Sequence, residues 1–449
     1  MAPRRMFRRK IYDHMLEWKR GEGSTALLIE GARRVGKTTV VREFARNEYR
    51  SHILIDFSVC DDDIKGLIDT YSRGADRFFQ RLQELTGTEL HTRQSLIVFD
   101  EVQLYPRARQ LIKHLVEDGR YDYIETGSLI SIKENVEDIL IPSEEESMDM
   151  HPMDFEEFLW AQGNEATADL LREDFKAMEP LGIATHRRIL DMYITYMIVG
   201  GMPQAVEAFL EDNSFESAER AKRRILDLYS RDMVKINARR ILDSIPAQLS
   251  RHVKSFSPSM VRKDSRVRDH LSSVDWLTES KIVNRCICSS DPGPSPGLSV
   301  DGNTFKLYLL DTGLLITASF REDVADRGVL LRELLSGRLN VNEGMFFENM
   351  VAQELVMAGH ELVFAKFMHR DSPNPQEVDF LIAGGNRVVP IEVKSGTSSR
   401  HKSLDRFMDR FADRAGRAYV IHSKDLRVDG DVTYIPIYMA MFLRAGTLQ

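Results

Sequence analysis

The chain has 449 residues, a length at which proteins usually divide into two or three domains. Hydrophobic residues make up 43% and charged residues 29%, the balance of a globular protein rather than of a disordered or fibrous one. The formal net charge of −8 argues against a protein that coats nucleic acid through its overall field, since that field requires an excess of Lys and Arg. Any contact with DNA or RNA must therefore come from a local patch.

The cysteines and the apolar runs bear on the compartment. Cys60, Cys286 and Cys288 are too few for a disulfide framework, which favours a reducing compartment. Cys286 and Cys288 lack a second pair of ligands at zinc spacing, so we expect them to be buried on a strand without a metal. No stretch reaches the roughly 20 apolar residues of a membrane helix, and the Arg-rich residues 1–10 lack the apolar core of a signal peptide. The sequence predicts a cytoplasmic protein without a membrane partner.

The first 150 residues predict an α/β domain. Apolar runs bounded by Gly and polar residues occur at 26–30, 52–57, 95–99 and 121–126, with helical patterns between them. Because parallel neighbours need a crossover connection, this alternation predicts a parallel sheet covered on both faces. We assign residues 1–150 to this domain.

A phosphate-binding loop follows the first predicted strand. Gly31, Gly36, Lys37 and Thr38 match the pattern GxxxxGK[ST], and a helical pattern at 39–47 follows. The glycines let backbone N–H groups face phosphate oxygens, Lys37 neutralises phosphate charge, and Thr38 is placed to coordinate Mg²⁺. The predicted nucleotide-binding residues are Gly31, Ala32, Arg33, Arg34, Val35, Gly36, Lys37, Thr38, Thr39 and, as a γ-phosphate sensor after the fourth strand, Ser128. The predicted ligands are ATP and Mg²⁺.

An acidic pair ends the third predicted strand. Four apolar residues precede Asp100 and Glu101 in the sequence SLIVFDE, so Asp100 falls where the ligand site of an open α/β sheet lies. We predict that Asp100 and Thr38 hold Mg²⁺, and that Glu101 orients the attacking water and accepts its proton. The predicted catalytic residues are therefore Lys37, Asp100 and Glu101.

The middle of the chain is predicted to be mainly helical. Apolar residues recur three or four apart from His151 to about Arg240, which predicts a helical lid at 151–245. Many Arg and Lys residues fall within 220–240, where a solvated face is favoured over a nucleic-acid surface. Two short helical patterns followed by alternation predict a winged-helix-like module at 246–300.

The last segment, 301–449, is predicted to contain a β-hairpin. Two strand patterns at 378–382 and 388–394 are joined by Ala-Gly-Gly-Asn, a good hairpin signal. Pro390 limits ladder pairing, so we expect the second strand to be an edge strand or to be bulged there.

This hairpin carries the residues of a second candidate metal site. Glu392 and Lys394 share one face of the second strand, and Asp379 lies on the neighbouring strand. Two carboxylates and an amine can hold a divalent cation and activate water for phosphodiester cleavage. Glu348 stands on the apolar stripe of a helix predicted at 344–359, where it is costly unless paired or metal-bound, and we count it as the fourth member. A solvated hairpin is the alternative.

Motifs along most of the chain resemble a known family. They are GARRVGKTT (31–39), IVFDEVQ (97–103), TGS (126–128), PMDFEEFL (152–159), GGMPQAV (200–206), KLYLLDTGLL (306–315), FFENMVAQEL (346–355), and EVDFLI with IEVKSG (377–396). In this order they resemble bacterial and archaeal AAA-type ATPases with a carboxy-terminal domain of unknown function that has the restriction-endonuclease-like, PD-(D/E)xK fold.

The resemblance implies an ATPase core, a helical and winged-helix middle, and an α/β nuclease-like end at 301–449. It places ATP binding on Lys37, Thr38 and Asp100. It also implies nuclease-like positions, which are Glu348, Asp379, Glu392 and Lys394.

The sequence leaves three functions open. The first two are ATP-hydrolysing switches or motors that act on DNA or RNA, and we favour these. In one of them the end domain is an active metal-dependent nuclease, and in the other it only binds a partner. A phosphate-loop kinase is disfavoured because Glu101 suits water activation. Assembly into a homo-oligomer is left open.

Overall fold

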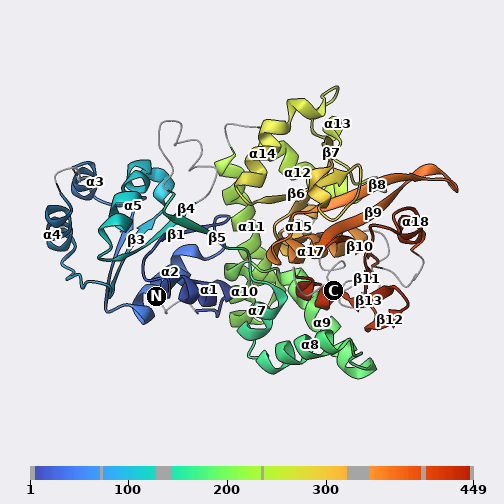
Figure 1. Cartoon of the computed structure of the whole chain (residues 1–449), viewed down its shortest axis with the longest axis horizontal. Helices are drawn as coiled ribbons and strands as arrows, with labels where there is room; N and C mark the ends of the chain where they lie inside the picture. The colour runs from blue at the N-terminus through green and yellow to red at the C-terminus, as the bar shows by residue number, and fades with distance from the viewer. Residues whose placement is uncertain are drawn as a thin grey trace. The chain divides into compact units, whose positions relative to one another are not determined.

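The computed structural model describes residues 6–70, 74–127, 143–233, 237–320, 343–395 and 401–444 (Figure 1). The chain forms two compact units, each described by itself. Unit 1 comprises residues 1–151 and 279–281, and unit 2 comprises residues 152–278 and 282–449. None of the described helices is both long and apolar enough to cross a membrane.

Unit 1 is built on a parallel sheet. Its strands are β1 (Ala26–Glu30), β2 (Ser51–Asp56), β3 (Ser95–Asp100), β4 (Asp122–Gly127) and β5 (Glu145–Asp149). Its helices are α1 (Lys10–Lys19), α2 (Lys37–Glu48), α3 (Asp62–Asp69), α4 (Ala75–Thr86), the 3-10 helix η2 (Val102–Leu104) and α5 (Pro106–Asp118). The described strands pair in the order β2-β3-β4-β1-β5, and each pair is parallel. The predicted parallel α/β sheet is confirmed in this part of the chain.

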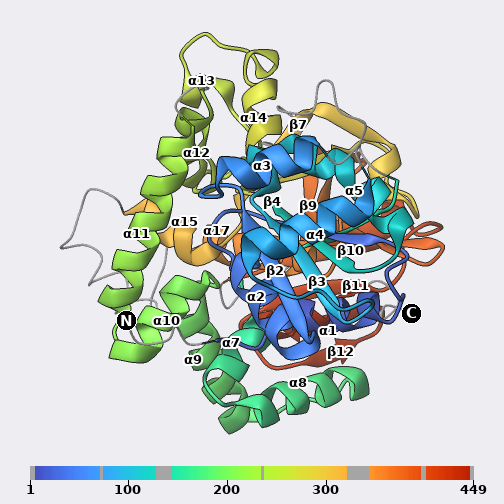
Figure 2. The ribbon, with the colours of Figure 1, turned by 90° about the vertical axis from the view of Figure 1, so that its left-hand side faces the viewer.

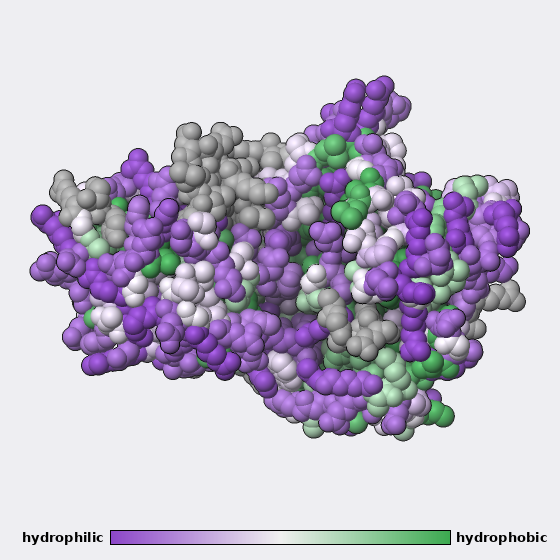
Figure 3. Space-filling model, in the orientation of Figure 1, coloured by the Kyte–Doolittle hydropathy of each residue, from purple (hydrophilic) through white to green (hydrophobic). Residues whose placement is uncertain are grey.

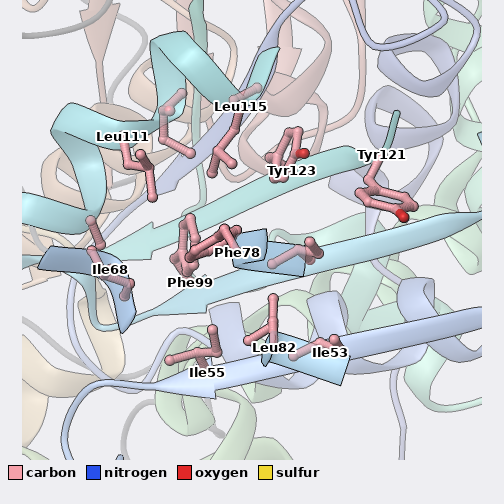
Figure 4. Packing of buried hydrophobic residues seen from close by; sticks show 14 of the residues in the cluster. Ile53, Ile55, Ile68, Phe78, Leu82, Phe99, Leu111, Leu115, Tyr121 and Tyr123 are labelled. Atoms are coloured by element: carbon pink, nitrogen blue, oxygen red, sulfur yellow. The ribbon is translucent and has the colours of Figure 1, made fainter. Parts of the chain in front are cut away.

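Alternation of side chains along the strands gives the sheet two apolar faces. On one face Ile53, Ile55 and Phe99 pack with Phe78 of α4 and Leu111 of α5 in a buried cluster (Figure 4). Helix α2 contacts β2, β3 and β4 and buries its own apolar stripe. Each fully buried side chain of this size contributes about 2 kcal/mol to folding, so these faces hold the carboxyl ends of the strands in place.

Strand β5 is an edge strand that the apolar pattern did not predict. Its sequence, EESMD, is polar, and it pairs only with β1 among the described strands. The side chain of Glu145 is nevertheless only 5% exposed, and its carboxylate accepts three hydrogen bonds at 2.6 to 3.2 Å from the guanidinium of Arg109 of α5. Beside it, burial raises the pKa of the Glu125 carboxyl well above its usual value, which favours the neutral acid at this point of β4.

Unit 2 begins with helices. They are α7 (Phe155–Ala161), α8 (Glu165–Ala177), α9 (Ile183–Val199), α10 (Pro203–Asp212), α11 (Phe215–Asp232), α12 (Ala238–Leu249), α13 (Pro258–Val261), η3 (Val267–Asp269) and α14 (Leu271–Glu279). The Asp154 carboxylate caps α7 by accepting the backbone N–H of Glu157 at 2.9 Å. Helices thus occupy the segment in which the sequence predicts a lid, and the role of a lid stays a prediction.

A mixed sheet forms the rest of unit 2. The elements are β6 (Val283–Ser289), η4 (Pro296–Leu298), β7 (Val300–Leu309), α15 (Thr312–Ser319), α17 (Glu343–Met357), β8 (Val363–His369), β9 (Ser372–Gly384), β10 (Arg387–Val393), α18 (Lys402–Arg410), β11 (Ala418–His422), β12 (Arg427–Asp429), β13 (Val432–Pro436) and η5 (Ile437–Phe442). The described strands pair in the order β12-β13-β11-β10-β9-β8-β6-β7. The pairs β10–β11, β11–β13 and β6–β8 are parallel, and the others are antiparallel.

This sheet crosses the domain boundary that the sequence places at residue 300. Strands β6 and β7 form an antiparallel hairpin, as a wing would, but β6 also pairs with β8, with Ile287 opposite Val363. The strands of the expected winged-helix-like module, 246–300, therefore belong to the carboxy-terminal sheet instead of closing a separate domain. Alternation of apolar and polar residues predicts that a segment is a strand, but it does not predict which distant strand, here β8, it pairs with.

Strand β10 also differs from the expectation. It lies between β9 and β11, so it is not an edge strand, and its register with β9 runs without a bulge at Pro390. Its ladder with β11 begins only at Ile391, so the N–H group that Pro390 lacks is not needed on that side.

Two sequence motifs meet inside unit 2. The buried Asp311 carboxylate accepts the backbone N–H of Gly201 at 2.6 Å. The buried Lys222 ammonium donates to the carbonyl of Gly313 at 3.2 Å. A side chain at Gly200 would collide with Asp311, because its Cβ would lie 2.5 Å from a carboxylate oxygen. The motifs GGM (200–202) and DTG (311–313) thus connect the helical region to the end of strand β7.

Candidate nucleotide site and carboxylate cluster

The predicted phosphate-binding loop lies between β1 and α2. Lys37, the first residue of α2, is buried, and its ammonium donates to the carbonyls of Gly31 and Ala32 at 2.9 and 3.1 Å. Gly36 has a φ of 102°, a left-handed conformation that favours glycine. A Cβ at Gly31 would lie 2.2 Å from the carbonyl oxygen of Met150, so the close approach of these two backbones also requires glycine.

The carboxyl end of β3 places an acid beside this loop. Asp100 is 2% exposed, and its Oδ1 accepts the Thr38 hydroxyl at 2.9 Å and also the hydroxyl of Thr126. Burial raises the pKa of the Asp100 carboxyl, while the two hydroxyl donors oppose that rise. Burial lowers the pKa of the Lys37 ammonium, against the attraction of Glu101 and Asp100. The structure thus brings together the hydroxyl and the carboxylate predicted to hold Mg²⁺.

Glu101 follows β3 in an unusual backbone conformation. Its φ of 55° lies in the left-handed region, which is uncommon for a residue with a side chain and is often found at functional sites. Its backbone N–H faces the hydroxyl of Thr126 at 3.4 Å, and its carboxylate accepts a hydrogen bond from the amide of Gln103. Gln103 therefore positions the carboxylate that is predicted to aim the attacking water.

The remaining predicted nucleotide-binding residues divide into two groups. Ala32 and Val35 are buried in the loop, whereas Arg33, Arg34 and Thr39 are exposed. Their backbone N–H groups can contribute to a phosphate site whichever way their side chains point. The predicted sensor, Ser128, lies outside the described residues, and the hydroxyl that the structure places beside the acidic pair is that of Thr126.

One buried arginine supports the loop and was not predicted. Arg9 donates from its guanidinium to the carbonyl of Val35 at 2.9 Å and to that of His151 at 2.6 Å. The sequence indicated only a basic start of the chain, and no local pattern separates Arg9 from its neighbours. Arg9 fixes the apex of the loop from the side of α1.

An Arg9→Ala change is expected to weaken nucleotide binding. Removing the guanidinium takes a charged hydrogen-bond donor away from the loop carbonyl of Val35 and from the carbonyl of His151, and such a bond is typically worth about 1.5–3 kcal/mol. We expect roughly a 10-fold rise in the dissociation constant for a fluorescent ATP analogue, measured by titration. Arg8→Ala, which removes an exposed neighbouring charge, is the matched control. Equal effects from the two changes would refute a specific role for Arg9.

The four residues of the second predicted site also come together, in unit 2. Glu348 of α17 is 2% exposed. Its carboxylate accepts hydrogen bonds from the ammonium of Lys306 at 3.0 Å, from the ammonium of Lys254 and from the hydroxyl of Tyr308. These donors hold the pKa of the Glu348 carboxyl down at about 2, although burial opposes this. Both of its oxygens are thus already bound by side chains of the protein.

The negative charges of the other two carboxylates, Asp379 and Glu392, are balanced by fewer hydrogen-bond donors. Asp379 accepts the backbone N–H of Val393 at 2.8 Å, and Glu392 accepts the Lys394 ammonium at 2.6 Å through Oε1. Burial, with the nearby charges of Glu392 and Glu348, raises the pKa of the Asp379 carboxyl to about 8. The buried Oε2 of Glu392 has no hydrogen-bond partner within the described residues.

Two further lysines of this cluster, Lys254 and Lys306, were not predicted from the sequence. The fully buried ammonium of Lys306 lies 2.7 Å from Glu377, 3.0 Å from Glu348 and 4.0 Å from Asp379. Within the part of the chain that the structure describes, no three or more His, Cys, Asp or Glu side chains are arranged to hold a metal ion. Of the three predicted carboxylates, Glu348 has both oxygens bound by side chains, whereas Glu392 keeps one oxygen without a hydrogen-bond partner within the described residues.

Comparisons with known proteins bear mainly on unit 1. Residues 23–159 match the family model of an AAA domain. Residues 190–324 match a domain of unknown function (DUF8612), and residues 343–440 match another (DUF4143). No curated protein matches the chain. The match to the AAA domain supports an AAA-type P-loop ATPase, a family that suggests ATP binding and hydrolysis.

Solved structures resemble the chain only loosely. Cdc6p from Pyrobaculum aerophilum is 14% identical with a TM-score of 0.26, covering 76% of this chain and 97% of its own. PCH-2 from C. elegans is 11% identical with a TM-score of 0.25, covering 50% and 68%. Protein VC1899 from Vibrio cholerae is 11% identical with a TM-score of 0.18, covering 93% and 96%. TM-scores this low do not support any conclusion about the fold or the function of this chain.

Proposed function

We propose that unit 1 binds ATP with Mg²⁺ and hydrolyses it, and that hydrolysis drives a conformational switch in the protein. The observation that carries the proposal is the 2.9 Å contact between the hydroxyl of Thr38 and the carboxylate of Asp100, next to the buried Lys37. A hydroxyl, a carboxylate and an ammonium converge at the carboxyl end of a parallel sheet, where nucleotides bind in such folds.

The residues present fit a nucleotide and a metal ion. Thr38 and Asp100 supply the hard oxygen ligands that Mg²⁺ prefers, and the bound ion would neutralise charge on the phosphates. Lys37 exchanges its loop carbonyls for phosphate oxygens, and the N-terminus of α2 adds backbone N–H donors. Glu101 accepts the proton of the attacking water and is held for this by Gln103.

Magnesium-dependent turnover tests the proposal. The full chain is expected to bind a fluorescent ATP analogue and to release phosphate from ATP without any added acceptor, and excess EDTA should abolish release. Phosphate release without an acceptor also separates this reaction from that of a phosphate-loop kinase. Absence of magnesium-dependent binding would overturn the proposal at its first step.

A metal-dependent nuclease in unit 2 is the second candidate function. Glu392 is buried and Asp379 is half-buried, the Oε2 of Glu392 has no hydrogen-bond partner among the residues that the structure describes, and the Lys394 ammonium lies 2.6 Å from Glu392. Two such carboxylates could hold a divalent cation, and the amine could stabilise negative charge that develops on a phosphate. The alternative is an end domain that binds a partner without cleaving it.

Cleavage by the nuclease candidate should depend on Lys394 and not on the phosphate-binding loop. With Mn²⁺ and plasmid DNA or total RNA, the wild-type chain is expected to cleave, and Lys394→Ala to lose at least 100-fold of the rate. Lys37→Met should cleave like the wild type when ATP is absent. Cleavage that survives Lys394→Ala, or no cleavage by the wild type, would leave partner binding as the role of the end domain.

A further inference from the structure

A basic segment stands out against the acidic whole. Residues 251–268, which we call the basic segment, read RHVKSFSPSMVRKDSRVR and hold six Lys or Arg residues against one Asp. The formal net charge of the complete chain is −8. A local excess of positive charge of this kind is the feature that binding to a phosphate backbone requires.

The charged end of the basic segment is exposed. Arg262, Lys263, Arg266 and Arg268 all lie on the surface. The chain between α13 and α14 projects from the rest of unit 2 in two perpendicular views (Figures 1 and 2). Hydrophilic side chains cover this projection at the upper edge of the space-filling view (Figure 3). The guanidinium and ammonium groups can therefore reach a large partner without rearrangement of the surrounding fold.

Local hydrogen bonds and ring packing also anchor the basic segment to the fold. The Ser265 hydroxyl bonds to the carbonyl of Pro258 at 2.9 Å and faces the imidazole of His270 at 2.8 Å. Phe256 stacks on Phe305 of β7 with ring centroids 5.0 Å apart, and its N–H donates to the carbonyl of Phe305 at 2.7 Å. A surface that is already ordered loses little conformational entropy when it binds.

Acidic side chains compensate this charge only weakly. Asp269 is the carboxylate nearest to both Arg262 and Arg268, at 3.8 and 3.9 Å, and all three side chains are at least one-third exposed. Neither Lys263 nor Arg266 forms an ion pair with any residue that the structure describes. Exposed pairs at such distances contribute little, so the positive potential of the segment is left for a partner.

From these observations we infer that the basic segment is a docking surface for the phosphate backbone of duplex DNA. A duplex presents closely spaced phosphates to the four exposed cations within residues 262–268, and binding releases its condensed counterions. Single strands are usually held by exposed aromatic rings on which bases stack. The only phenyl ring in the segment, that of Phe256, is 7% exposed and already stacked within the protein. The surface thus suits a duplex whose bases stay paired.

The inference is tested by fluorescence anisotropy with the full chain and a labelled 20-base-pair duplex of arbitrary sequence. The wild type is expected to bind with an affinity that falls steeply with salt, by a slope of about −3 to −4 for four phosphate contacts. Lys37→Met is expected to bind the duplex equally well, so a failure of the ATPase proposal would leave this result intact. No binding at 50 mM salt, or a flat salt dependence, would overturn the inference.

A matched pair of double variants locates the surface. Arg262→Ala/Lys263→Ala should weaken duplex binding roughly 10- to 100-fold at 0.1 M salt and reduce the salt slope by about 2. Arg187→Ala/Arg188→Ala removes the same charge from exposed positions on α9 and should change neither quantity. Equal losses in both variants would overturn the assignment to the basic segment. Tighter binding of single-stranded DNA or of duplex RNA than of duplex DNA would overturn the choice of partner.

Discussion

A Glu101→Gln variant is expected to bind ATP as the wild type does and to hydrolyse it at least 100-fold more slowly. The amide keeps the size of the side chain and can still bond to Gln103, but it cannot accept the proton of the attacking water. General-base catalysis by a positioned side chain typically contributes about 10²- to 10⁴-fold to a rate. Binding is measured with a fluorescent ATP analogue, and turnover by phosphate release.

Lys37→Met should fail one step earlier, at binding. The buried ammonium donates to two carbonyls of the loop, and a thioether of similar length cannot neutralise phosphate charge. We expect the dissociation constant for ATP to rise at least 100-fold, since interactions with phosphates by a desolvated ammonium are strong. Comparison of Lys37→Met with Glu101→Gln therefore separates the effect on ATP binding from the effect on the hydrolysis step.

The matched control for Glu101→Gln is Asp56→Asn. Asp56 ends the neighbouring strand β2, pairs in register with Asp100, and accepts the backbone N–H of Ser58 at 2.9 Å. Removing its charge should leave turnover within about twofold of the wild type. If Asp56→Asn slows hydrolysis as much as Glu101→Gln does, the effect is the general loss of negative charge at this edge of the sheet and the role of Glu101 as a base is refuted.

The parts of the fold that sequence predicted well are those set by local patterns. The run ALLIE at residues 26–30 coincides with β1, and the spacing from Gly31 to Thr38 places a lysine at the start of α2. Both features depend on residues within a few positions of one another. The edge strand β5 was missed because EESMD is polar, and the partner of its Glu145 is Arg109, which is 36 residues away in sequence.

The unpredicted parts of the candidate sites are contacts between distant segments. Glu348 was singled out because a carboxylate on an apolar stripe requires a partner, and the structure supplies Lys306 and Lys254. Their positions, 42 and 94 residues earlier in the chain, give no local signal that they would meet Glu348. Arg9, which supports the loop from α1, was missed for the same reason. The predicted cytoplasmic location and homo-oligomer stay predictions, since the fold of one chain bears on neither.

Lys306→Met is expected to lower the free energy of unfolding of unit 2 by about 3–5 kcal/mol at pH 7, the usual cost of leaving buried charges without their partner. Lys306 is fully buried between Glu348, Glu377 and Asp379. Its matched control is Lys366→Met. That side chain is 29% exposed and lies 3.5 Å from Glu377, so its loss should cost at most about 1 kcal/mol. Urea denaturation followed by circular dichroism measures both changes.

The pH dependence and a second substitution identify charge as the cause of this loss. The pKa of Glu348 is held at about 2, below its usual value, so its ionised form adds stability above about pH 4.5 that is lost as the pH falls toward 2. Without Lys306 that pKa rises, and the deficit of Lys306→Met should be largest at neutral pH and shrink toward pH 4. Adding Glu348→Gln removes one of the stranded charges and should restore part of the stability, because replacing both members of a buried pair costs less than replacing one. A deficit that is constant with pH and unrelieved by Glu348→Gln would instead mean that Lys306 acts through packing, and the charge balance of this cluster would not govern the stability of the end domain.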